Sequence, residues 1–180
     1  MTAPERDEFA RVYDEHIWDV YGFFGYRLKS KEACEDLTQQ TFEQALRAWG
    51  RFDPERAKPK TWLLAIAQNL LVDHYRRGSG QARSGPLDDE AIAAVERNRS
   101  TSNEEGMGLA PDLESALDQL DERSRQLIAL RFGGDLTGPE IADLTGLSLA
   151  NVQQILSRSL RRLREALEAE SGDSARVREG

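Results

Sequence analysis

The sequence predicts an all-α fold of two small helical domains joined by a flexible acidic linker, with a helix-turn-helix as the second domain. Apolar residues recur at intervals of three or four along most of the chain, as they do on one face of a helix, and no run alternates as a strand does. Residues 78–111 interrupt this periodicity and are rich in glycine, serine and acidic side chains, which is typical of a linker. Near the end of the chain a glycine separates two capped helical segments, the pattern of a helix-turn-helix.

The predicted first domain spans residues 1–77 and contains three helices. An apolar stripe begins at Phe9 and predicts the first helix. Ser30 is an N-cap residue type and precedes a second stripe. The segment 50–60 contains glycine, two prolines and several charges, so it is predicted to be a loop. Thr61 is then the predicted cap of a third helix.

The predicted second domain spans residues 112–169 and contains four helical segments. Asp112 is the predicted cap of the first segment, and Thr137 is the predicted cap of the helix that leads into the turn. Gly146 makes the turn, and Ser148 caps the long last helix. The remaining segment, residues 170–180, is short and polar and is predicted to be disordered.

The charge of the chain is divided unevenly along its length. The whole chain has a net charge of −8. Residues 78–122 alone carry a net charge of −8, whereas residues 123–164 carry a net charge of +4. Local charge determines the local electrostatic field, so the acidic total does not argue against nucleic-acid binding by the last helix.

Several classes of function have no support in the sequence. There is one cysteine, Cys34, so no disulfide framework is expected. The two histidines, His16 and His74, fall on apolar helix faces and form no metal-ligand cluster with Cys34. We therefore expect no metal, no cofactor, no catalytic residue and no enzymatic activity. No signal peptide or membrane-spanning run is visible, so we expect a cytoplasmic protein that does not insert into a membrane.

The last helix has the composition of a recognition helix. In a helix-turn-helix the first turns of the second helix meet base edges in the major groove, and later cations meet phosphates. Asparagine and glutamine can pair bidentately with adenine, which is worth about 1–3 kcal/mol of discrimination per contact. The alternative is a solvated arginine face on an ordinary amphipathic helix. The predicted DNA-contacting residues of this helix are Ser148, Leu149, Ala150, Asn151, Gln153, Gln154, Ser157, Arg158 and Arg161.

Three segments together resemble a known family. They are EDLTQQTFEQALRAW (35–49), TWLLAIAQNLLVDHYRR (61–77) and LTGPEIADLTGLSLANVQQILSRSLRRLR (136–164). Their sequences and order resemble bacterial RNA polymerase sigma factors of the extracytoplasmic-function (ECF) group. The resemblance covers most of residues 9–77 and 112–167.

The resemblance implies a role for each part. Residues 1–77 would correspond to sigma region 2, which docks on the polymerase clamp and recognises and melts the minus-ten promoter element. Residues 112–169 would correspond to region 4, which recognises the minus-35 element. The acidic linker would thread through the RNA-exit path of the polymerase; its composition fits a simple soluble spacer equally well.

The resemblance also assigns residues in the first domain. A polar face of the second helix would bind polymerase; in many relatives a glutamate stands where this chain has Gln40. Residues 47–77 carry a net charge of +4, which suits a nucleic-acid strand. The implied polymerase-binding residues are Asp36, Gln39, Gln40 and Glu43. The implied minus-ten residues are Arg51, Lys58, Lys60, Trp62, Gln68, Asn69, Arg76 and Arg77.

Two functions of different classes remain. The resemblance implies a transcription initiation factor whose partners are core RNA polymerase, promoter DNA and an anti-sigma factor. The alternative is a free-standing helix-turn-helix repressor or activator, in which the first domain serves dimerisation or sensing. The segments 35–49 and 61–77 favour the first function, because a repressor has no need of them.

Overall fold

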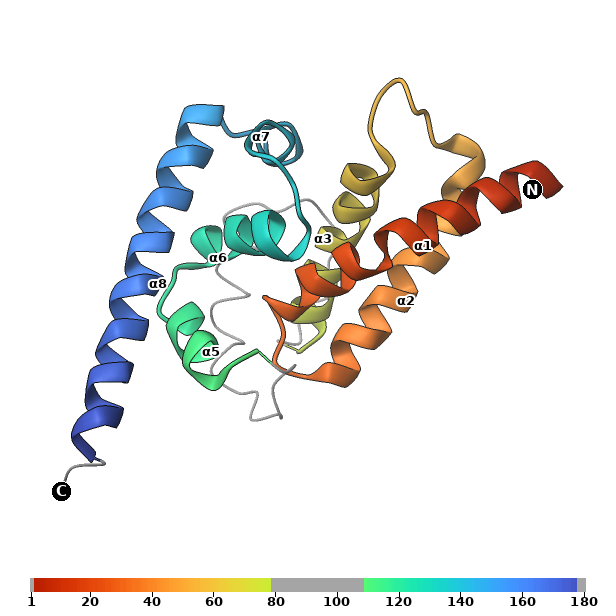
Figure 1. Ribbon diagram of the computed structural model, residues 1–180. Helices are drawn as coiled ribbons and strands as arrows, with labels where there is room; N and C mark the ends of the chain where they lie inside the picture. Colours follow the sequence, from red (N-terminus) through yellow and green to blue (C-terminus); the bar gives the residue numbers. More distant parts are fainter. Residues whose placement is uncertain (1, 79–108, 178–180) are drawn as a thin grey trace.

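The structure, a computed structural model, describes residues 2–78 and 109–177. Every regular element among these residues is a helix, which confirms the predicted all-α class. Figure 1 shows the N-terminal helices packed beside the C-terminal ones, with the last helix, α8, along the outer edge. The predicted acidic linker lies almost wholly outside the described residues.

The first helix, α1 (Ala3–Gly25), begins well before the apolar stripe that predicted it. Thr2 and Glu5 form a capping box, in which the Glu5 side chain accepts from the Thr2 backbone N–H. This local pairing, together with a proline in the first turn, starts the helix ahead of its buried face.

The next two helices are α2 (Lys31–Ala48) and α3 (Pro59–Gly78). Ser30 caps α2 as predicted, since its side chain accepts from the Ala33 N–H at 3.1 Å. The prediction that Thr61 caps α3 is wrong, because the helix already begins at its proline. A proline fits the first helical turn, where its missing N–H has no intrahelical partner.

The C-terminal helices begin with α5 (Pro111–Asp118) and α6 (Glu122–Ile128). Asp112 lies inside the first turn of α5 and not before it, so its predicted role as N-cap is wrong. Asp121 caps α6 by accepting from the Ser124 N–H at 2.9 Å. A π-helical turn, η3 (Ala129–Gly133), then ends this helical segment.

The helix-turn-helix consists of α7 (Gly138–Thr145) and α8 (Leu149–Val177). Thr137 caps α7 as predicted, in a capping box with the glutamate three residues on. Gly146 ends α7 with φ +72°, a left-handed conformation that favours glycine. Ser148 caps α8 as predicted, since its Oγ accepts from the Asn151 N–H at 3.2 Å.

The structure corrects the predicted tail. Helix α8 continues to Val177, so residues 170–177, which the sequence predicted to be disordered, are helical. The segment is polar, and we attribute the difference to propagation, because extending an existing helix costs far less than starting one.

One apolar core joins the N-terminal and C-terminal helices. Helix α1 packs on η3 as well as on α2 and α3. The large side chains Phe23, Leu64 and Leu130 are fully buried in this core, and they come from α1, α3 and η3. A second, smaller cluster lies beneath α8 and includes Leu117 and Leu163. The two predicted domains are therefore in direct contact.

Cys34 and His16 are buried, as their apolar helix faces predicted. His16 Nδ1 lies 3.1 Å from a carboxylate oxygen of Asp19. Burial, assisted by the nearby Glu35 carboxylate, raises the pKa of the Cys34 thiol to about 12. Among the described helices, none is long and apolar enough to cross a membrane.

Candidate nucleic-acid interface

The first turns of α8 present the polar side chains that the sequence predicted. Val152 is fully buried and fixes which side of the helix faces α7. The residues next to it in the sequence on both sides face solvent, and Leu149 is 40% exposed. The exposed predicted residues are Leu149, Ala150, Asn151, Gln153, Gln154, Ser157, Arg158 and Arg161. These eight residues and the capping residue Ser148, which lies at the start of the helix, are the nine predicted positions, and they form one surface.

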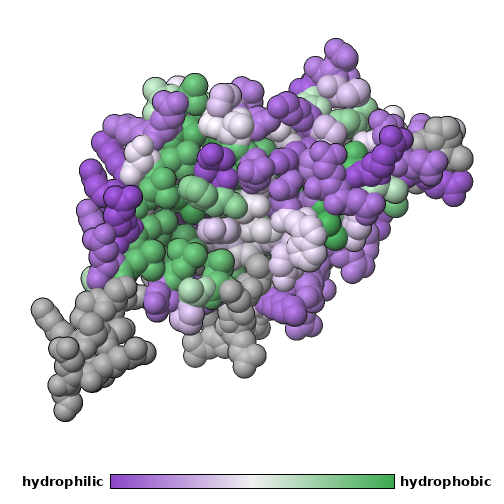
Figure 2. Space-filling model, in the orientation of Figure 1, coloured by the Kyte–Doolittle hydropathy of each residue, from purple (hydrophilic) through white to green (hydrophobic). Residues whose placement is uncertain are grey.

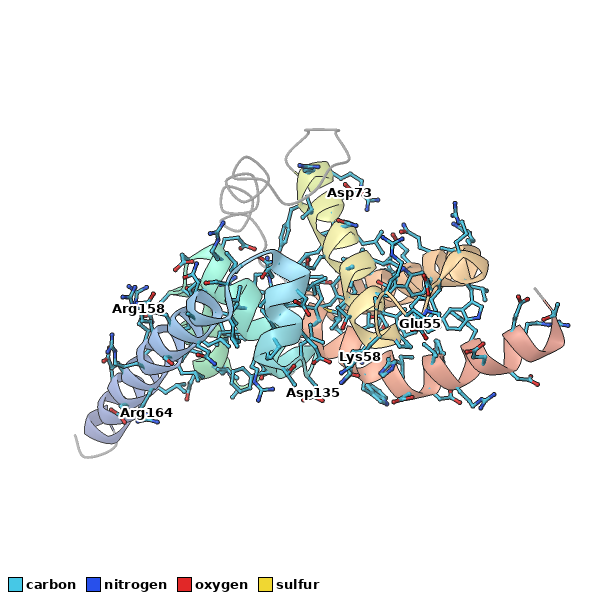
Figure 3. All side chains as sticks on the ribbon, turned by 90° about the horizontal axis from the view of Figure 1, so that it is seen from above. Glu55, Lys58, Asp73, Asp135, Arg158 and Arg164 are labelled. Atoms are coloured by element: carbon cyan, nitrogen blue, oxygen red, sulfur yellow. The ribbon has the colours of Figure 1, made fainter. Side chains whose placement is uncertain are left out.

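The arginines of α8 follow one or more turns later. Figure 3 labels Arg158 and Arg164 on α8; both are exposed, and Arg164 also borders the groove between α8, α5 and η3. Arg161 lies 4.0 Å from Glu165, and both side chains are about two-thirds exposed or more (71% and 67%). Exposed pairs of this kind contribute little to stability, so the arginines remain available to phosphate groups.

The predicted minus-ten residues lie on α3 and on the loop before it, but they do not form one open surface. Arg51, Lys58, Asn69 and Arg77 are exposed, and Lys60, Trp62 and Arg76 are half-buried. Gln68 is buried, with 8% of its surface exposed.

Trp62 belongs to an aromatic cluster at the start of α3. Its ring lies 4.9 Å from the ring of Phe52 and 6.0 Å from that of Trp49. Trp49 and Phe52 are themselves stacked, with ring centroids 5.1 Å apart. The cluster holds the segment 52–58 against α3, and Trp62 keeps one side toward solvent.

Two lysines of the minus-ten set pair with acids of the C-terminal helices. Lys58 donates to Glu140 at 2.7 Å. Lys60 lies 3.1 Å from Asp135 and 3.3 Å from Asp19. Burial alone would lower the pKa of Lys60, but the hydrogen bonds and negative charges of Asp135 and Asp19 outweigh it and raise that pKa. Figure 3 shows Lys58 and Asp135 at the junction of the two groups of helices.

Glu140 makes the stability of the chain depend on acid pH. The hydrogen bond from Lys58, with the backbone N–H and hydroxyl of Thr137, lowers the pKa of Glu140 to about 2. A carboxyl group whose pKa is lower in the folded than in the unfolded state stabilises the fold at pH values above its unfolded-state pKa. This stabilisation is lost as the pH falls through the folded-state pKa. We expect the free energy of unfolding of the native chain to fall more steeply than that of Glu140→Gln between about pH 4.5 and pH 2. Urea denaturation followed by circular dichroism at several pH values measures both slopes.

Glutamine is the informative replacement because it can still close the capping box with Thr137. The matched control is Glu165→Gln, which removes a carboxylate from an exposed pair with Arg161. We expect this control to retain the pH dependence of the native chain. Parallel slopes for the native chain and Glu140→Gln would contradict the assignment.

The predicted polymerase-binding residues lie on one face of α2. Asp36, Gln39 and Glu43 are exposed, and Gln40 is half-buried. Gln39 donates to Glu43 at 2.9 Å along the helix. Asp36 and Gln40 also line a pocket of about 470 Å³ whose other wall is α5. One edge of this face thus borders a pocket shared with the C-terminal helices.

An apolar groove lies between α8, α5 and η3. Figure 2 shows hydrophobic side chains gathered on this side of the molecule. Phe132 and Leu160 are 47% and 45% exposed, and both line the groove. The described residues hold no group of three or more His, Cys, Asp or Glu arranged to bind a metal ion.

Sequence reasoning missed the residues that join the two groups of helices. Arg27, next to the end of α1, and Glu122, the first residue of α6, form an ion pair, and they are 6% and 1% exposed. Both occur in strongly charged segments, so neither stood out as a buried position. A charged residue at the start of a helix is ordinarily a solvated one.

Comparison with protein families identifies both parts of the chain. Residues 12–81 match the model of sigma-70 region 2, and residues 116–165 match that of sigma-70 region 4. The first range contains the residues predicted to contact the minus-ten element and polymerase, and the second contains the predicted DNA-contacting residues of α8.

Curated relatives share this organisation. The chain is 33% identical to the ECF RNA polymerase sigma factor BldN of Streptomyces coelicolor over 167 residues, which are 92% of this chain and 62% of BldN. It is 29% identical to the ECF sigma factor SigK of Mycobacterium ulcerans, over 94% of this chain and 90% of SigK. The chain therefore spans somewhat less than two thirds of BldN and most of SigK.

Solved structures show the same fold. CnrH in complex with the cytosolic domain of CnrY superposes with a TM-score of 0.60 at 25% identity, covering 91% of this chain and 90% of CnrH. The sigma factor RpoE of Bartonella quintana, in complex with the anti-sigma factor NepR, superposes with a TM-score of 0.64 at 18% identity, covering 89% of this chain and 97% of RpoE. With regions 2 and 4 matched in this order and ECF sigma factors as its relatives, the chain belongs to the sigma-70 family of bacterial RNA polymerase sigma factors, in the extracytoplasmic-function group.

Proposed function

We propose that this chain is a promoter-specificity subunit of RNA polymerase that binds the core enzyme, recognises minus-35 and minus-ten elements and promotes melting. Residues 112–169 would read the minus-35 element, and residues 1–77 would dock on core polymerase and engage the minus-ten element. Residues 78–111 would connect the two. The observation that carries the proposal is that both family regions are matched on one chain, each over the helices that bear its polar surface.

The surface chemistry supports this assignment. Neutral hydrogen-bonding side chains precede the arginines on α8, which suits base edges followed by phosphates. On α2 the exposed face is polar, as expected for a protein contact that forms and dissolves. Since core polymerase and promoters lie in the cytoplasm of a bacterium, we assign the chain's action to that compartment.

We further propose that an anti-sigma factor holds the chain inactive. The relative CnrH, similar to this chain over most of its length, has been solved in complex with the cytosolic domain of CnrY. The exposed apolar groove beside α8 supports a protein partner in general, since large exposed apolar patches are typical of interaction sites.

Reconstituted transcription tests the proposal. The purified chain is mixed with core RNA polymerase and genomic fragments, and run-off transcripts are mapped. We expect core association and transcripts from a restricted set of start sites. Tight binding of a palindromic operator by the chain alone, without core association, would instead establish the repressor or activator alternative.

Gln153 and Gln154 are expected to determine the preferred minus-35 sequence. Both are exposed in the first turns of α8, beside the buried Val152. Replacing both by alanine removes two amide groups, each worth about 1–3 kcal/mol of base discrimination. We expect a changed set of preferred upstream sequences when holoenzyme selects promoters from a randomised minus-35 library. An unchanged preference would contradict this role.

Arg161→Ala is the matched control on the same helix. A phosphate contact carries no base information, so binding should weaken to a similar degree across the library. The plot of log affinity against log salt concentration should flatten by about one unit or less. The two variants therefore separate sequence reading from backbone attraction.

A further inference from the structure

A small polar cavity lies between α3 and α6, inside the core. Every residue that lines it is at least nine-tenths buried. Apolar side chains such as Phe23 and Leu71 form part of the wall, and the polar side chains of Gln68, Glu122 and Gln126 form another part. The volume of the cavity is about 10 Å³. This is the lower end of the roughly 10–15 Å³ that one water molecule needs, so the cavity is too small for an organic ligand.

Two polar atoms at this cavity have no partner in the described part of the chain. Gln68 Nε2, an N–H donor on α3, is buried and forms no hydrogen bond there. Glu122 Oε2, an acceptor on α6, is buried and forms none either. Buried polar groups nearly always have a partner, which is another protein group or an ordered water molecule. This donor and this acceptor border one cavity without bonding each other, so a molecule that accepts from one and donates to the other would satisfy both.

The other carboxylate oxygen of Glu122 is already committed. Its Oε1 accepts a hydrogen bond from Nη2 of Arg27, and both side chains are almost fully buried. Moving the carboxylate toward Gln68 would break this ion pair. Breaking a buried ion pair is strongly unfavourable, because each charge is then left inside the protein without compensation. The ion pair therefore holds Glu122 in place at the edge of the cavity.

Contacts next to the cavity hold its walls apart. The hydroxyl of Tyr75 donates to the backbone carbonyl of Arg27 at 2.6 Å, which ties the end of α1 to α3. Gly22, which precedes Phe23 of the cavity wall, lies against the backbone of Gly133 in η3. A Cβ added at Gly22 would lie 2.6 Å from the carbonyl oxygen of Gly133, so this close approach requires glycine. These contacts oppose the movement that would close the cavity and bring its donor and acceptor together.

The chemistry of the lining favours water over a metal cation. The cavity contains one carboxylate, which Arg27 already neutralises, and the N–H group of Gln68 would repel a cation. Hard cations such as Ca²⁺ take several oxygen ligands, which this lining does not supply. A water molecule can accept from the amide and donate to the carboxylate, and such a bridge is nearly as favourable as a direct hydrogen bond. The amide of Gln126 offers a further partner, and buried waters typically make about three hydrogen bonds.

We propose that one water molecule binds in this cavity as part of the folded structure, accepting from Gln68 Nε2 and donating to Glu122 Oε2. The water extends the ion pair of Arg27 and Glu122 to α3, so that these polar groups form one connected network within an apolar core. The network gives the amide of Gln68 a structural role that involves no contact with DNA. The proposal therefore stands independently of the function proposed for the chain.

A crystal structure of the full-length chain, at a resolution that shows ordered waters, tests the site directly. We expect a density peak about 2.5–3.2 Å from both Gln68 Nε2 and Glu122 Oε2. A direct hydrogen bond between these two side chains, or a cavity without density, would overturn the proposal. So would a peak about 2.3–2.6 Å from Glu122 Oε2 with further oxygen ligands at similar distances, because those distances identify a metal cation.

Magnetic relaxation dispersion of the water oxygen nucleus counts long-lived internal waters in solution. Gln68→Met removes the amide and keeps a side chain of similar length. We expect this variant to hold one long-lived water fewer than the native chain, with its helix content by circular dichroism unchanged. Gln119→Met is the matched control, because Gln119 is exposed and lies outside the cavity lining. We expect the control to keep the native number of waters.

Two results in solution would contradict the proposal. One is a native chain with no long-lived internal water, a measurement that does not depend on the folding of any variant. The other is a folded Gln68→Met variant with the native number of waters, which would show that the amide holds none of them. If Gln68→Met loses helix content, the crystal structure and the water count of the native chain decide. Run-off transcription is scored separately, so failure of the proposed function is distinguishable from failure of the water site.

Discussion

Replacing Phe42 by alanine is expected to lower the free energy of unfolding by about 3–5 kcal/mol, the usual cost of deleting a buried aromatic ring. Phe42 lies on α2, is 5% exposed, and contacts α1 through the rings of Phe9 and Tyr13 at 6.5 and 4.7 Å. Both contacts are edge-to-face, a favoured geometry that the variant loses in addition to the buried area. Urea denaturation followed by circular dichroism gives the difference.

Trp18→Ala is the matched control for Phe42→Ala. Trp18 is a larger aromatic residue on α1, but it is 74% exposed. Little of its surface is removed from water on folding, so we expect a change within about 0.5 kcal/mol. Equal destabilisation by the two variants would show that burial of Phe42 does not hold α1 against α2.

Replacing Val152 of the helix-turn-helix by aspartate is expected to lower the free energy of unfolding by an amount comparable with that of Phe42→Ala. Val152 is fully buried among other side chains, with 0% of its surface accessible to water. In Val152→Asp the new carboxyl group must be buried without a partner or must push α7 and α8 apart. We expect a loss of at least about 3 kcal/mol of stability and loss of minus-35 binding, measured by urea denaturation and by anisotropy with a selected duplex.

Gln153→Asp separates folding from recognition. Gln153 is adjacent to Val152 but exposed, so the same carboxylate should leave the unfolding free energy nearly unchanged. It should still weaken DNA binding, because a negative charge then faces the phosphates. Unfolding of both variants to the same extent would contradict the assignment of inner and outer faces on α8.

Local sequence features predicted the helix-turn-helix with good accuracy. Thr137, Gly146 and Ser148 act where their residue types indicated, because capping and left-handed turns depend on side chains only a few residues away. The starts of α3 and α5 were less well predicted. In both cases a proline just ahead of the expected cap already begins the helix.

The contact between the two regions could not be predicted from local patterns. Gly22 and Gly133 are far apart in the sequence, and each is an unremarkable helical glycine until the partner backbone is known. Arg27 and Glu122 have charged neighbours and ordinary helix-end positions. Their burial is a consequence of tertiary packing, which periodicity and capping do not encode. The same contact explains why Gln68, an apparently available polar residue, is covered.

The rate at which the buried thiol of Cys34 is chemically labelled can report on the packing of α1 against α2. At neutral pH a thiol with a pKa of about 12 is almost entirely protonated and reacts slowly with maleimide or iodoacetamide reagents. Since this is the one cysteine of the chain, engineered surface cysteines could carry spectroscopic labels without removal of the native one. The labelling rate at Cys34 would then rise when α1 and α2 come apart, and would stay low when intact regions merely move relative to each other.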